Sequence, residues 1–467
     1  MINFFSIFQL LPQVLKNIIA SFYGLIQKRR RYGGIFPLLS DEFIRNENVT
    51  REQMRKKTLK NLEKILIHCA DNVPYYKKHL NASEIIKSQS PMDILQSLPV
   101  LKKSEVRLKN DQFINTKALN NRNLKFHYTS GSTGSPLKVY TLPENDQFNF
   151  ALGSRLLSFA NAGFQDKKVM FGGKPIMAMN KKKPPFWVTN YFESQLYCSS
   201  YHMSYENLKY YHSKILKFQP SFLIGYASSI TVYAKYLKSL NTKYNGKSLL
   251  GIFPSSETLL HEDKLIIEEV FKCKVHDGYS LAEYVNFIAE CEEGNYHISP
   301  EAGIIEILND NGMPLKNGQI GNIVCTTLFN TTMPLIRYDT GDIGSKHESD
   351  FYCNCGRKTA ILRKIIGRSM SYLNLNNNKK IGAAGLTTGF LSNEIIESQF
   401  IQHDIDSVLL KLVVTDKFTE ADKKILIKEM RNRLSPLILK IKFVKSISRS
   451  KNGKKEFIIN RINRNQN

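Results

Sequence analysis

Cysteine and acidic residues are both scarce in this chain. Its 467 residues include seven cysteines, an odd number that does not indicate a disulfide framework, so we expect a reducing, cytoplasmic location. Asp and Glu total 41 against 66 Lys and Arg, which gives a formal net charge of +25. This excess favours anionic partners such as nucleotides, acidic lipids or nucleic acid, without identifying one. A recognisable nucleic-acid-binding module is missing, so we expect no nucleic-acid partner.

A long uninterrupted apolar run is missing as well. Within residues 1–34, polar residues interrupt the most apolar stretch, and the basic residues 28–31 follow its apolar part. A spanning helix needs ~20 mostly apolar residues, and a signal peptide has its charges first, so neither fits. We predict an amphipathic helix with these residues near one face: Phe4, Phe5, Phe8, Leu11 and Leu15. Two interpretations stay open, because this face either packs on its own domain or lies peripherally at a membrane with anionic headgroups.

Length and composition predict more than one ordered domain. A single core seldom grows beyond ~250–300 residues, so a chain of this length is expected to form at least two domains. Hydrophobic residues make up 42% of the chain, including 27 Phe and 22 Tyr, which supplies ample material for packed cores. Global disorder is therefore excluded.

Strand and helix patterns alternate from about residue 124 onward. An amphipathic helix is predicted before them at 51–70, and strand candidates follow at 168–173, 222–226, 249–253 and 274–279. This alternation predicts α/β layers, in which ligands gather beyond the carboxyl ends of the strands. Shorter strand and turn patterns at 303–307 and 321–326 predict a β-rich subdomain.

The C-terminal part has the pattern of a separate small domain. The Asn-rich run 373–380 is typical of a boundary loop. Beyond it, 407–414 is a strand candidate, 419–434 a helix opened by a Thr-x-x-Asp cap, and 441–447 another strand. These elements predict a small α+β domain.

The segment 128–138 is rich in hydroxyl residues and glycine and ends in Lys138. Glycines let backbone N–H groups approach an anion closely, and hydroxyls add hydrogen bonds, so the segment is suited to hold a phosphate. It is not a Walker A motif, because Ser-Pro-Leu-Lys rather than Lys-Ser/Thr follows Gly134. Taken alone, it could equally be an ordinary polar loop.

Three further motifs follow this segment in a fixed order. They are Gly-Tyr-Ser-Leu-Ala-Glu at 278–283, Arg-Tyr-Asp-Thr-Gly-Asp at 337–342 leading to Gly367-Arg368, and Gly453-Lys454. Together the four segments resemble the adenylate-forming superfamily of acyl-CoA synthetases and adenylation domains. Within it they are similar to the phenylacetate–coenzyme A ligase-like branch that includes capsule-biosynthesis proteins of the CapK type. The resemblance extends over about residues 35–460.

The resemblance implies a fold and an activity. The fold is α/β, with a large multi-subdomain N-terminal adenylate-forming domain at 35–368 and a small mobile α+β domain at 369–467. In the implied reaction, a carboxylate attacks the α-phosphate of ATP, pyrophosphate leaves, and the acyl group then passes to coenzyme A or another acceptor. ATP, Mg²⁺, a small carboxylic acid and coenzyme A are the ligands that follow from it.

Site residues for the phosphates and the metal follow from the same resemblance. Negative charge builds on the phosphate oxygens during adenylation, so fixed donors, a cation and a metal ion stabilise the transition state. Lys138 would lie near the β- and γ-phosphates, and Glu283 would hold Mg²⁺. The residues that would hold these phosphates are Thr129, Ser130, Gly131, Ser132, Thr133 and Gly134.

The nucleoside and the α-phosphate are assigned in the same way. Tyr279 and Glu257 would border the adenine, although a helix cap explains the Glu257 segment nearly as well. Asp342 would accept hydrogen bonds from both ribose hydroxyls, and Arg368 would reach the ribose or a phosphate. Lys454 would bridge the carboxylate and the α-phosphate, with Lys455 as the alternative in register.

Three positions depart from the pattern of the family. Ser280 replaces a glycine, Ala282 replaces a hydroxyl residue that contacts the α-phosphate, and Ser369 stands where most relatives have an acidic hinge. Loss of one preorganised donor can lower a rate by ~10²–10³. A catalytically weakened scaffold or binding protein of polysaccharide assembly is therefore the alternative to an acid–thiol ligase-like enzyme in surface-polysaccharide biosynthesis.

Four residues could form a closed metal site. Cys353 and Cys355 form a close pair, and Cys291 with His297 lies upstream beside the Glu283 segment. Three thiolates and one imidazole satisfy tetrahedral zinc. Some relatives carry a similar Cys-x-Cys-Gly-Arg, so structural zinc is one interpretation and unligated thiols are the other.

Overall fold

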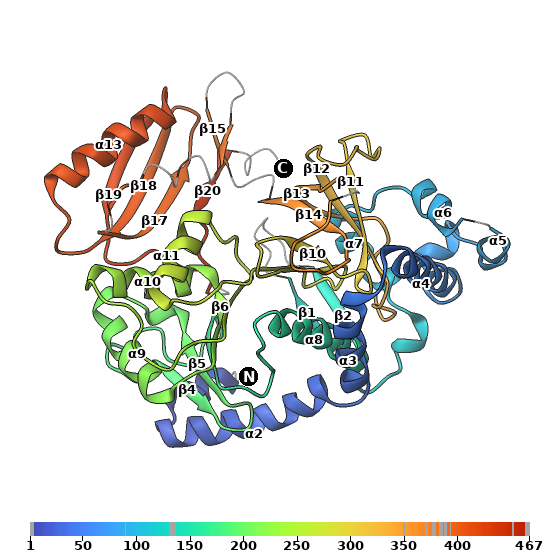
Figure 1. Cartoon of the computed structure of the whole chain (residues 1–467), viewed down its shortest axis with the longest axis horizontal. Helices are drawn as coiled ribbons and strands as arrows, with labels where there is room; N and C mark the ends of the chain where they lie inside the picture. Colours follow the sequence, from blue (N-terminus) through green and yellow to red (C-terminus); the bar gives the residue numbers. More distant parts are fainter. Residues whose placement is uncertain are drawn as a thin grey trace. The chain divides into compact units, whose positions relative to one another are not determined.

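The computed structural model describes residues 4–88, 90–129, 137–348, 351–368, 372–375, 380–382, 386, 390–392, 394–450 and 453–462. The chain divides into two units, each of which combines segments that are distant in the sequence (Figure 1). Unit 1 contains residues 1–25, 165–277 and 369–467, and unit 2 contains 26–164 and 278–368. The division into domains at 1–34, 35–368 and 369–467 stays a prediction, and its second boundary coincides with a boundary of unit 2.

A mostly parallel sheet forms the centre of unit 1. Its described strands have the order β4-β5-β3-β6-β7, and only β4 runs antiparallel to its neighbour. Apolar residues of β3, β6 and β7 are buried on both faces, as in parallel sheets covered by helices. The bounds are β3 Lys168–Gly172, β4 Trp187–Asn190, β5 Gln195–Ser199, β6 Phe222–Tyr226, β7 Gly251–Ser255, α9 Tyr205–Phe218, α10 Ala227–Ser239 and α11 His261–Phe271.

These bounds test the predicted strands. The candidates at 168–173 and 222–226 are confirmed as β3 and β6, and the one at 249–253 is shifted by two residues to β7. In the fourth candidate, 274–279, only the last residues extend as β8 (Gly278–Ser280), in unit 2. Its first part makes only an isolated bridge, Ile252 with Val275, in unit 1.

The N-terminal segment covers the open edge of this sheet. It forms two helices, α1 (Phe4–Leu10) and α2 (Gln13–Tyr32), where the sequence predicts one; Pro12, which has no backbone N–H, separates them. Phe8 is buried, and Leu11 packs against the same small core, so part of the predicted apolar face is turned inward. No helix in the described part of the chain is long and apolar enough to span a membrane.

Side chains of α2 satisfy the outward backbone groups of β4. Gln13 Nε2 donates to the carbonyl of Trp187 at 2.8 Å, Asn17 Oδ1 accepts from the N–H of Thr189 at 3.0 Å, and Ser21 Oγ accepts from the N–H of Tyr191 at 3.0 Å. The three donors and acceptors are spaced four residues apart and therefore lie along one face of the helix. An edge strand that could pair with another chain is thereby closed.

The C-terminal part of unit 1 is a helix on a small sheet. The described strands have the order β19-β18-β17-β20, and α13 packs Leu426, Met430 and Leu434 into the core of this layer (Figure 1). Thr419 and Asp422 form the predicted capping box. The bounds are β15 Tyr372–Asn374, β16 Lys380–Gly382, β17 Ile395–Gln402, β18 Ser407–Val414, α13 Glu420–Leu434, β19 Ile438–Phe443 and β20 Ile458–Asn460.

The predicted strand at 441–447 is wrong in its bounds. The strand begins at Ile438, directly after the turn that follows α13, and runs parallel to β18 as far as Phe443. Leu439 and Ile441 pack against this core, which fixes the register from the side of the helix. The strand at 407–414 is confirmed as β18, and residues 376–379 of the Asn-rich run lie outside the described residues.

Unit 2 is built around an antiparallel sheet with the described order β11-β12-β13-β14-β10-β9-β8. A separate hairpin, β1–β2, carries the glycine-rich segment. The strands are β1 Lys125–Tyr128, β2 Lys138–Thr141, β8 Gly278–Ser280, β9 Phe287–Glu290, β10 Tyr296–Ile298, β11 Gly303–Leu308, β12 Gly321–Thr327, β13 Tyr338–Lys346 and β14 Ile361–Arg368. The helices are α3 Phe36–Arg45, α4 Arg51–Asn72, α5 Ala82–Lys87, α6 Pro91–Ser97, α7 Lys103–Leu108 and α8 Pro143–Ser158.

The predicted helix at 51–70 is confirmed as α4, which a capping box of Thr50 and Gln53 opens. The β-rich texture predicted around 303–307 and 321–326 is confirmed by β11 and β12. Both strands contribute to the core of unit 2, which also receives Leu62 and Leu66 of α4.

A buried ion pair joins three segments of unit 2. Arg155 on α8 donates to both carboxylate oxygens of Glu301, at 3.0 and 2.7 Å, and also to the carbonyl of Phe43 on α3. Asn46 donates to the same carboxylate at 2.6 Å. Burial by itself raises the pKa of Glu301, but the charge and hydrogen bonds of Arg155 lower it below its ordinary value.

We expect Arg155→Leu to lower the free energy of unfolding by about 3–5 kcal/mol, because a buried carboxylate loses its partner. The wild type should also lose stability as the pH falls through the lowered pKa of Glu301, and it should retain this contribution fully above the ordinary pKa of a glutamate. Urea unfolding at several pH values measures both effects. An unchanged stability of Arg155→Leu at neutral pH would contradict this assignment.

Candidate functional site

The glycine-rich segment is closed at its base by Thr129. This buried residue accepts a hydrogen bond from the N–H of Leu137 through Oγ1 at 2.9 Å, and its own N–H donates to the carbonyl of Leu137 at 2.9 Å. The hairpin register pairs Tyr128 with Lys138 on either side. Thr129 therefore fixes the two ends of the turn, and its neighbours Ser130, Gly131, Ser132, Thr133 and Gly134 lie outside the described residues.

Lys138 is held by aromatic rings at the start of β2. Its Nζ lies 4.3 Å from the ring centre of Phe126 and 4.6 Å from that of Tyr140. A hydrogen bond with Tyr140 raises the pKa of Lys138. The lysine is therefore cationic at neutral pH and is oriented by its own hairpin.

Glu283 is buried and held by two donors. Its Oε1 accepts from Lys103 Nζ at 2.9 Å and from the hydroxyl of Tyr338 at 2.9 Å. Lys103 begins α7, and the preceding Leu101 exchanges backbone hydrogen bonds with Arg337 and Asp339. Among the described residues, no donor contacts Oε2 of Glu283, and the role of this residue as a metal ligand stays a prediction.

Tyr279 and Asp342 meet on the same sheet. The hydroxyl of Tyr279 donates to Asp342 Oδ2 at 2.8 Å, and burial together with this carboxylate raises the pKa of the phenol. Arg368 ends β14 and is the register partner of Asp342 on β13. The residues predicted for the adenine and the ribose, Tyr279, Asp342 and Arg368, are therefore on one sheet, whereas Ser369 at the predicted hinge lies outside the described residues.

Three contacts bring the predicted motifs of unit 2 together. The His127 ring contacts the carbonyl of Ala282 at 2.8 Å, so the hairpin lies beside the 279–283 segment. Glu283 and Tyr279 then connect this segment to Tyr338 and Asp342 of β13. Ala282 thus contributes its backbone carbonyl, although its side chain carries no hydroxyl.

The arginine of the 337–342 motif has a structural role. Arg337 is buried, has a positive φ of 48°, and pairs with Glu306 through both carboxylate oxygens at 3.2 Å. It also donates to the carbonyls of Gln96 and Leu98, which precede α7. A strained backbone persists where the surroundings hold it. Here the hydrogen bonds of Arg337 fix the segment before Tyr338 and the segment before Lys103.

In unit 1, Glu257 joins the parallel sheet to the C-terminal layer. It follows β7 and accepts from the N–H of Ser228, in the first turn of α10, at 2.9 Å. Its other oxygen accepts from the N–H of Lys455 at 2.6 Å. A carboxylate at a helix N-terminus is favourable. The predicted role of Glu257 at the adenine stays a prediction, since both oxygens are engaged here.

The turn that carries Lys454 requires a glycine. Gly453 has φ 75°, and an added Cβ would lie 2.6 Å from Cα of Gly173 and 2.8 Å from Oγ of Ser200. The N–H of Gly453 and the carbonyl of Lys454 both bond to the backbone of Ser450. Because Gly173 and Ser200 directly follow β3 and β5, Lys454 lies at the carboxyl edge of the parallel strands.

Lys455, the alternative in register, has different surroundings. Burial lowers its pKa, and the nearby carboxylate of Glu397 opposes this effect. Glu397 in turn binds Arg449, which also donates to Oγ of Ser228 at 2.9 Å. Lys455 is thus part of the same joint between the sheet and the C-terminal layer as Glu257.

The predicted metal ligands converge in unit 2. The ligand atoms of Cys291, His297, Cys353 and Cys355 all lie within 4.8 Å of one another. Burial lowers the pKa of His297 to about 4, so the imidazole is neutral, as a metal ligand must be. Its Nδ1 contacts Oγ1 of Thr359 at 2.9 Å, which leaves Nε2 facing Cys355.

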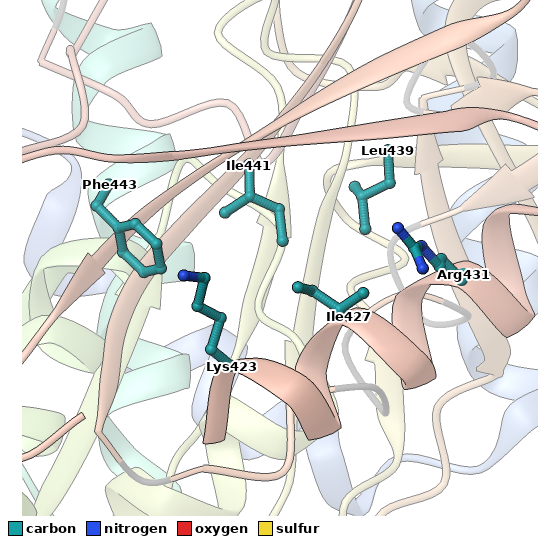
Figure 2. Close-up of a pocket in the computed structure, with 6 residues that line it drawn as sticks. All are labelled: Lys423, Ile427, Arg431, Leu439, Ile441 and Phe443. Atoms are coloured by element: carbon teal, nitrogen blue, oxygen red, sulfur yellow. The ribbon is translucent and has the colours of Figure 1, made fainter. Parts of the chain in front are cut away.

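A further cavity of about 360 Å³ lies on the C-terminal layer between α13 and β19 (Figure 2). Apolar side chains form most of its wall, with Lys423 and Arg431 projecting from the helix. None of its lining residues is a predicted site residue. The side chains that line it are Lys423, Ile427, Arg431, Leu439, Ile441 and Phe443.

Comparison with known proteins shows what this chain is similar to. Residues 373–461 match the family model of the CapK C-terminal domain. The chain is 29% identical over 460 residues to protein CapK of Staphylococcus aureus. The match covers 97% of this chain and 98% of CapK. The resemblance to the CapK-type branch of the adenylate-forming superfamily is confirmed. This CapK-like chain is also 25% identical over 348 residues to phenylacetate-coenzyme A ligase of Thermus thermophilus, covering 69% and 72% of the two chains.

Solved structures share the fold of the CapK-like chain. A crystal structure of 2-hydroxyisobutyryl-CoA ligase in the postadenylation state, in complex with R3-HIB-AMP, matches with a TM-score of 0.68 at 16% identity. The match covers 90% of this chain and 92% of that ligase. The predicted α/β class with a large N-terminal and a small C-terminal domain is thereby confirmed as the fold class of this chain.

Sequence reasoning missed three residues at the site of unit 2. Tyr338 lies inside the quoted 337–342 motif but was given no role, although a tyrosine within a polar turn is a candidate donor. Lys103 lies 180 residues before Glu283, and no local pattern connects them. His127 directly precedes the glycine-rich segment, and only its place in the hairpin β1–β2 connects it to the site.

Lys103→Met should lower the free energy of unfolding by about 2–4 kcal/mol, because Glu283 would keep a buried charge with only Tyr338 as donor. Adding Glu283→Gln should recover much of this loss, since a neutral amide needs no counter-charge. Urea unfolding of the two single variants and the double variant gives the coupling. Strictly additive effects would show that the ion pair does not matter to the fold.

Proposed function

We propose that this CapK-like chain activates a small carboxylic acid with ATP as an acyl-adenylate and transfers the acyl group to coenzyme A or another acceptor. The observation that carries the proposal is the meeting of the hairpin, the 279–283 segment and β13 around Glu283 and Asp342. The similarity to phenylacetate-coenzyme A ligases supports the reaction class. The resemblance to capsule-biosynthesis proteins favours a role in surface-polysaccharide biosynthesis.

Each group would act on a different part of ATP. The clamped hairpin, with Thr129 at its base and Lys138 on its second strand, would hold the β- and γ-phosphates. Asp342 would accept the ribose hydroxyls, with Tyr279 keeping its carboxylate in place and Arg368 nearby on β14. Lys454 would neutralise charge between the attacking carboxylate and the α-phosphate.

Glu283 fits a role in metal binding. One of its oxygens is fixed by Lys103 and Tyr338, and the other has no donor among the described residues. A bound Mg²⁺ would neutralise the charge on the phosphates as pyrophosphate leaves. Lys103 places a second positive charge beside the same carboxylate and so would moderate its affinity for the metal ion.

Carboxylate-dependent ATP–pyrophosphate exchange tests this function. A panel of aryl, hydroxy, amino and fatty acids should reveal one class that supports exchange. Glu283→Ala and Lys454→Ala should each slow it by ~10²–10³, because a metal ligand or a transition-state cation is lost. Lys440→Ala, at an exposed lysine of β19, is the matched control and should leave the rate unchanged.

The alternative function predicts another outcome. A catalytically weakened scaffold, favoured by Ser280, Ala282 and Ser369, would bind ATP without exchange for any acid.

Loss of activity in Lys455→Ala rather than Lys454→Ala would instead assign the adenylation lysine to the neighbouring position. Circular dichroism of each variant separates loss of chemistry from loss of fold.

We propose that Cys291, His297, Cys353 and Cys355 hold a structural zinc ion. Three sulfurs and one imidazole nitrogen within 4.8 Å suit tetrahedral coordination, with no position left open for chemistry. The loop between β13 and β14 would then be tied to β9 and β10. Cys291 and Cys353 are free cysteines, and their Sγ atoms are 3.7 Å apart, which is too far for a disulfide bond.

The purified chain should contain about one zinc ion per molecule. Cys355→Ser should lose it and lower the Tm by about 5 °C or more, because metal binding contributes to folding free energy. Cys273→Ser, at a cysteine outside the cluster, is the control and should retain the metal. Elemental analysis with thermal unfolding checks both; a zinc-free wild type in which the three cluster thiols are reactive would contradict the site.

We propose further that the chain acts in the cytoplasm and contacts the inner face of the membrane peripherally. Physical support comes from the N-terminal helices, whose outward face is apolar.

A further inference from the structure

Helix α2 is turned with its polar face toward the protein. Gln13, Asn17 and Ser21 bond to the backbone around β4, and Lys16, only 3% exposed, donates to the carbonyl of Gln9. At Gly24, an added Cβ would lie 2.2 Å from Nδ2 of Asn190, so the helix lies as close to this edge as glycine allows. Ile19 and Ala20 also pack inward, but the remaining exposed apolar residues of α2 lie outside.

The outward apolar residues form a continuous row. We define the apolar ridge as Leu10, Val14, Ile18 and Phe22, which follow one another at intervals of four. Their exposed fractions are 83%, 68%, 44% and 60%. Such a row normally faces the core of a protein. Single exposed apolar residues need no explanation, but three of them spaced four apart on α2, with Leu10 at the end of α1 before them, indicate a surface that another phase or molecule covers.

Aromatic residues beyond β4 extend the ridge. The rings of Phe22 and Phe192 have centroids 6.1 Å apart, and Phe192 and Tyr191 are 45% and 67% exposed. Tyr23 is 51% exposed and carries the ammonium group of Lys174 at 5.6 Å from its ring centre. Aromatic rings beside a lysine suit the boundary between headgroups and acyl chains.

Charge along this segment has one sign. No acidic residue precedes Asp41 in the sequence, and α2 ends in Arg29, Arg30 and Arg31. Arg30 pairs with Asp146, whereas Arg29 is exposed. An apolar face flanked by cations complements a bilayer with anionic headgroups, because basic residues near the surface are attracted to them.

We propose that the apolar ridge, with Tyr191 and Phe192, is the docking surface for an anionic lipid bilayer. The helices lie in the plane of the interface, with the Gln13–Ser21 face fixed to β4 and the ridge inserted among the lipids. This surface differs from the face predicted from the sequence, because Phe8 and Leu11 are packed inward. It specifies the proposed membrane contact and does not depend on the ligase chemistry.

Vesicle co-sedimentation without ATP or substrate tests the surface. Wild-type protein should bind phosphatidylcholine vesicles that contain about one third phosphatidylglycerol and bind purely neutral vesicles much more weakly. Leu10→Glu with Val14→Glu, at the two most exposed ridge positions, should weaken binding at least about tenfold, since two apolar insertions are lost. Arg29→Gln should weaken binding to anionic vesicles only.

A matched double variant controls for added charge. Leu108→Glu with Leu265→Glu introduces the same two charges at residues that are 83% and 52% exposed away from the ridge, and it should bind as the wild type does. Wild type that stays in the supernatant, or equal loss in both double variants, would overturn the proposal. So would lipid-free self-association that only the ridge variant abolishes, since a second copy would then cover the ridge.

ATP–pyrophosphate exchange on the same preparations separates the two proposals. The ridge variant should exchange at the wild-type rate with any acid that supports exchange, because its substitutions touch none of the proposed site residues. Vesicle binding by a protein that shows no exchange would leave the docking surface established and the ligase function refuted. Exchange without vesicle binding would give the opposite result.

Discussion

A buried carboxylate determines how unit 2 is organised around its candidate site. Glu283 cannot remain charged beneath the surface without donors, so Lys103 and Tyr338 have to arrive from two distant segments. Arg337 holds these segments together, because its guanidinium donates hydrogen bonds to Glu306 and to a carbonyl that precedes α7. The motif around residue 337 is therefore partly architectural: its arginine holds the backbone, and its neighbours face the ligands that we propose.

The sequence predicted much of the fold where local patterns are strong. Continuous apolar runs identified β3 and β6, and the Thr-x-x-Asp cap identified the start of α13. The error at β19 arose because the strand is fixed from outside, by packing of Leu439 and Ile441 in the core under the helix. The single predicted N-terminal helix failed at Pro12, where the missing N–H ends one helix before the next begins.

The candidate site was predictable in its motifs but not in its supports. Spacing and order pointed to Thr129, Tyr279, Glu283 and Asp342, which the structure brings together within unit 2. Lys103 could not be found, because an ion pair between residues so distant in sequence leaves no local pattern. The second bond of Glu257, to the backbone of Lys455, is equally invisible, since a backbone donor has no identity in the sequence.

The contact between α2 and β4 also has a consequence for how the chain can be shortened. Edge strands normally need a neighbouring strand, a charge or a bulge, whereas β4 is closed by three side chains that a helix presents at intervals of four. Removing the first 25 residues would therefore uncover a row of unsatisfied amides and carbonyls beside the aromatic pair Tyr191 and Phe192. A truncated chain would be open to strand addition from its own copies. The N-terminal helix, although its outer face is apolar, therefore protects the edge strand against polymerisation.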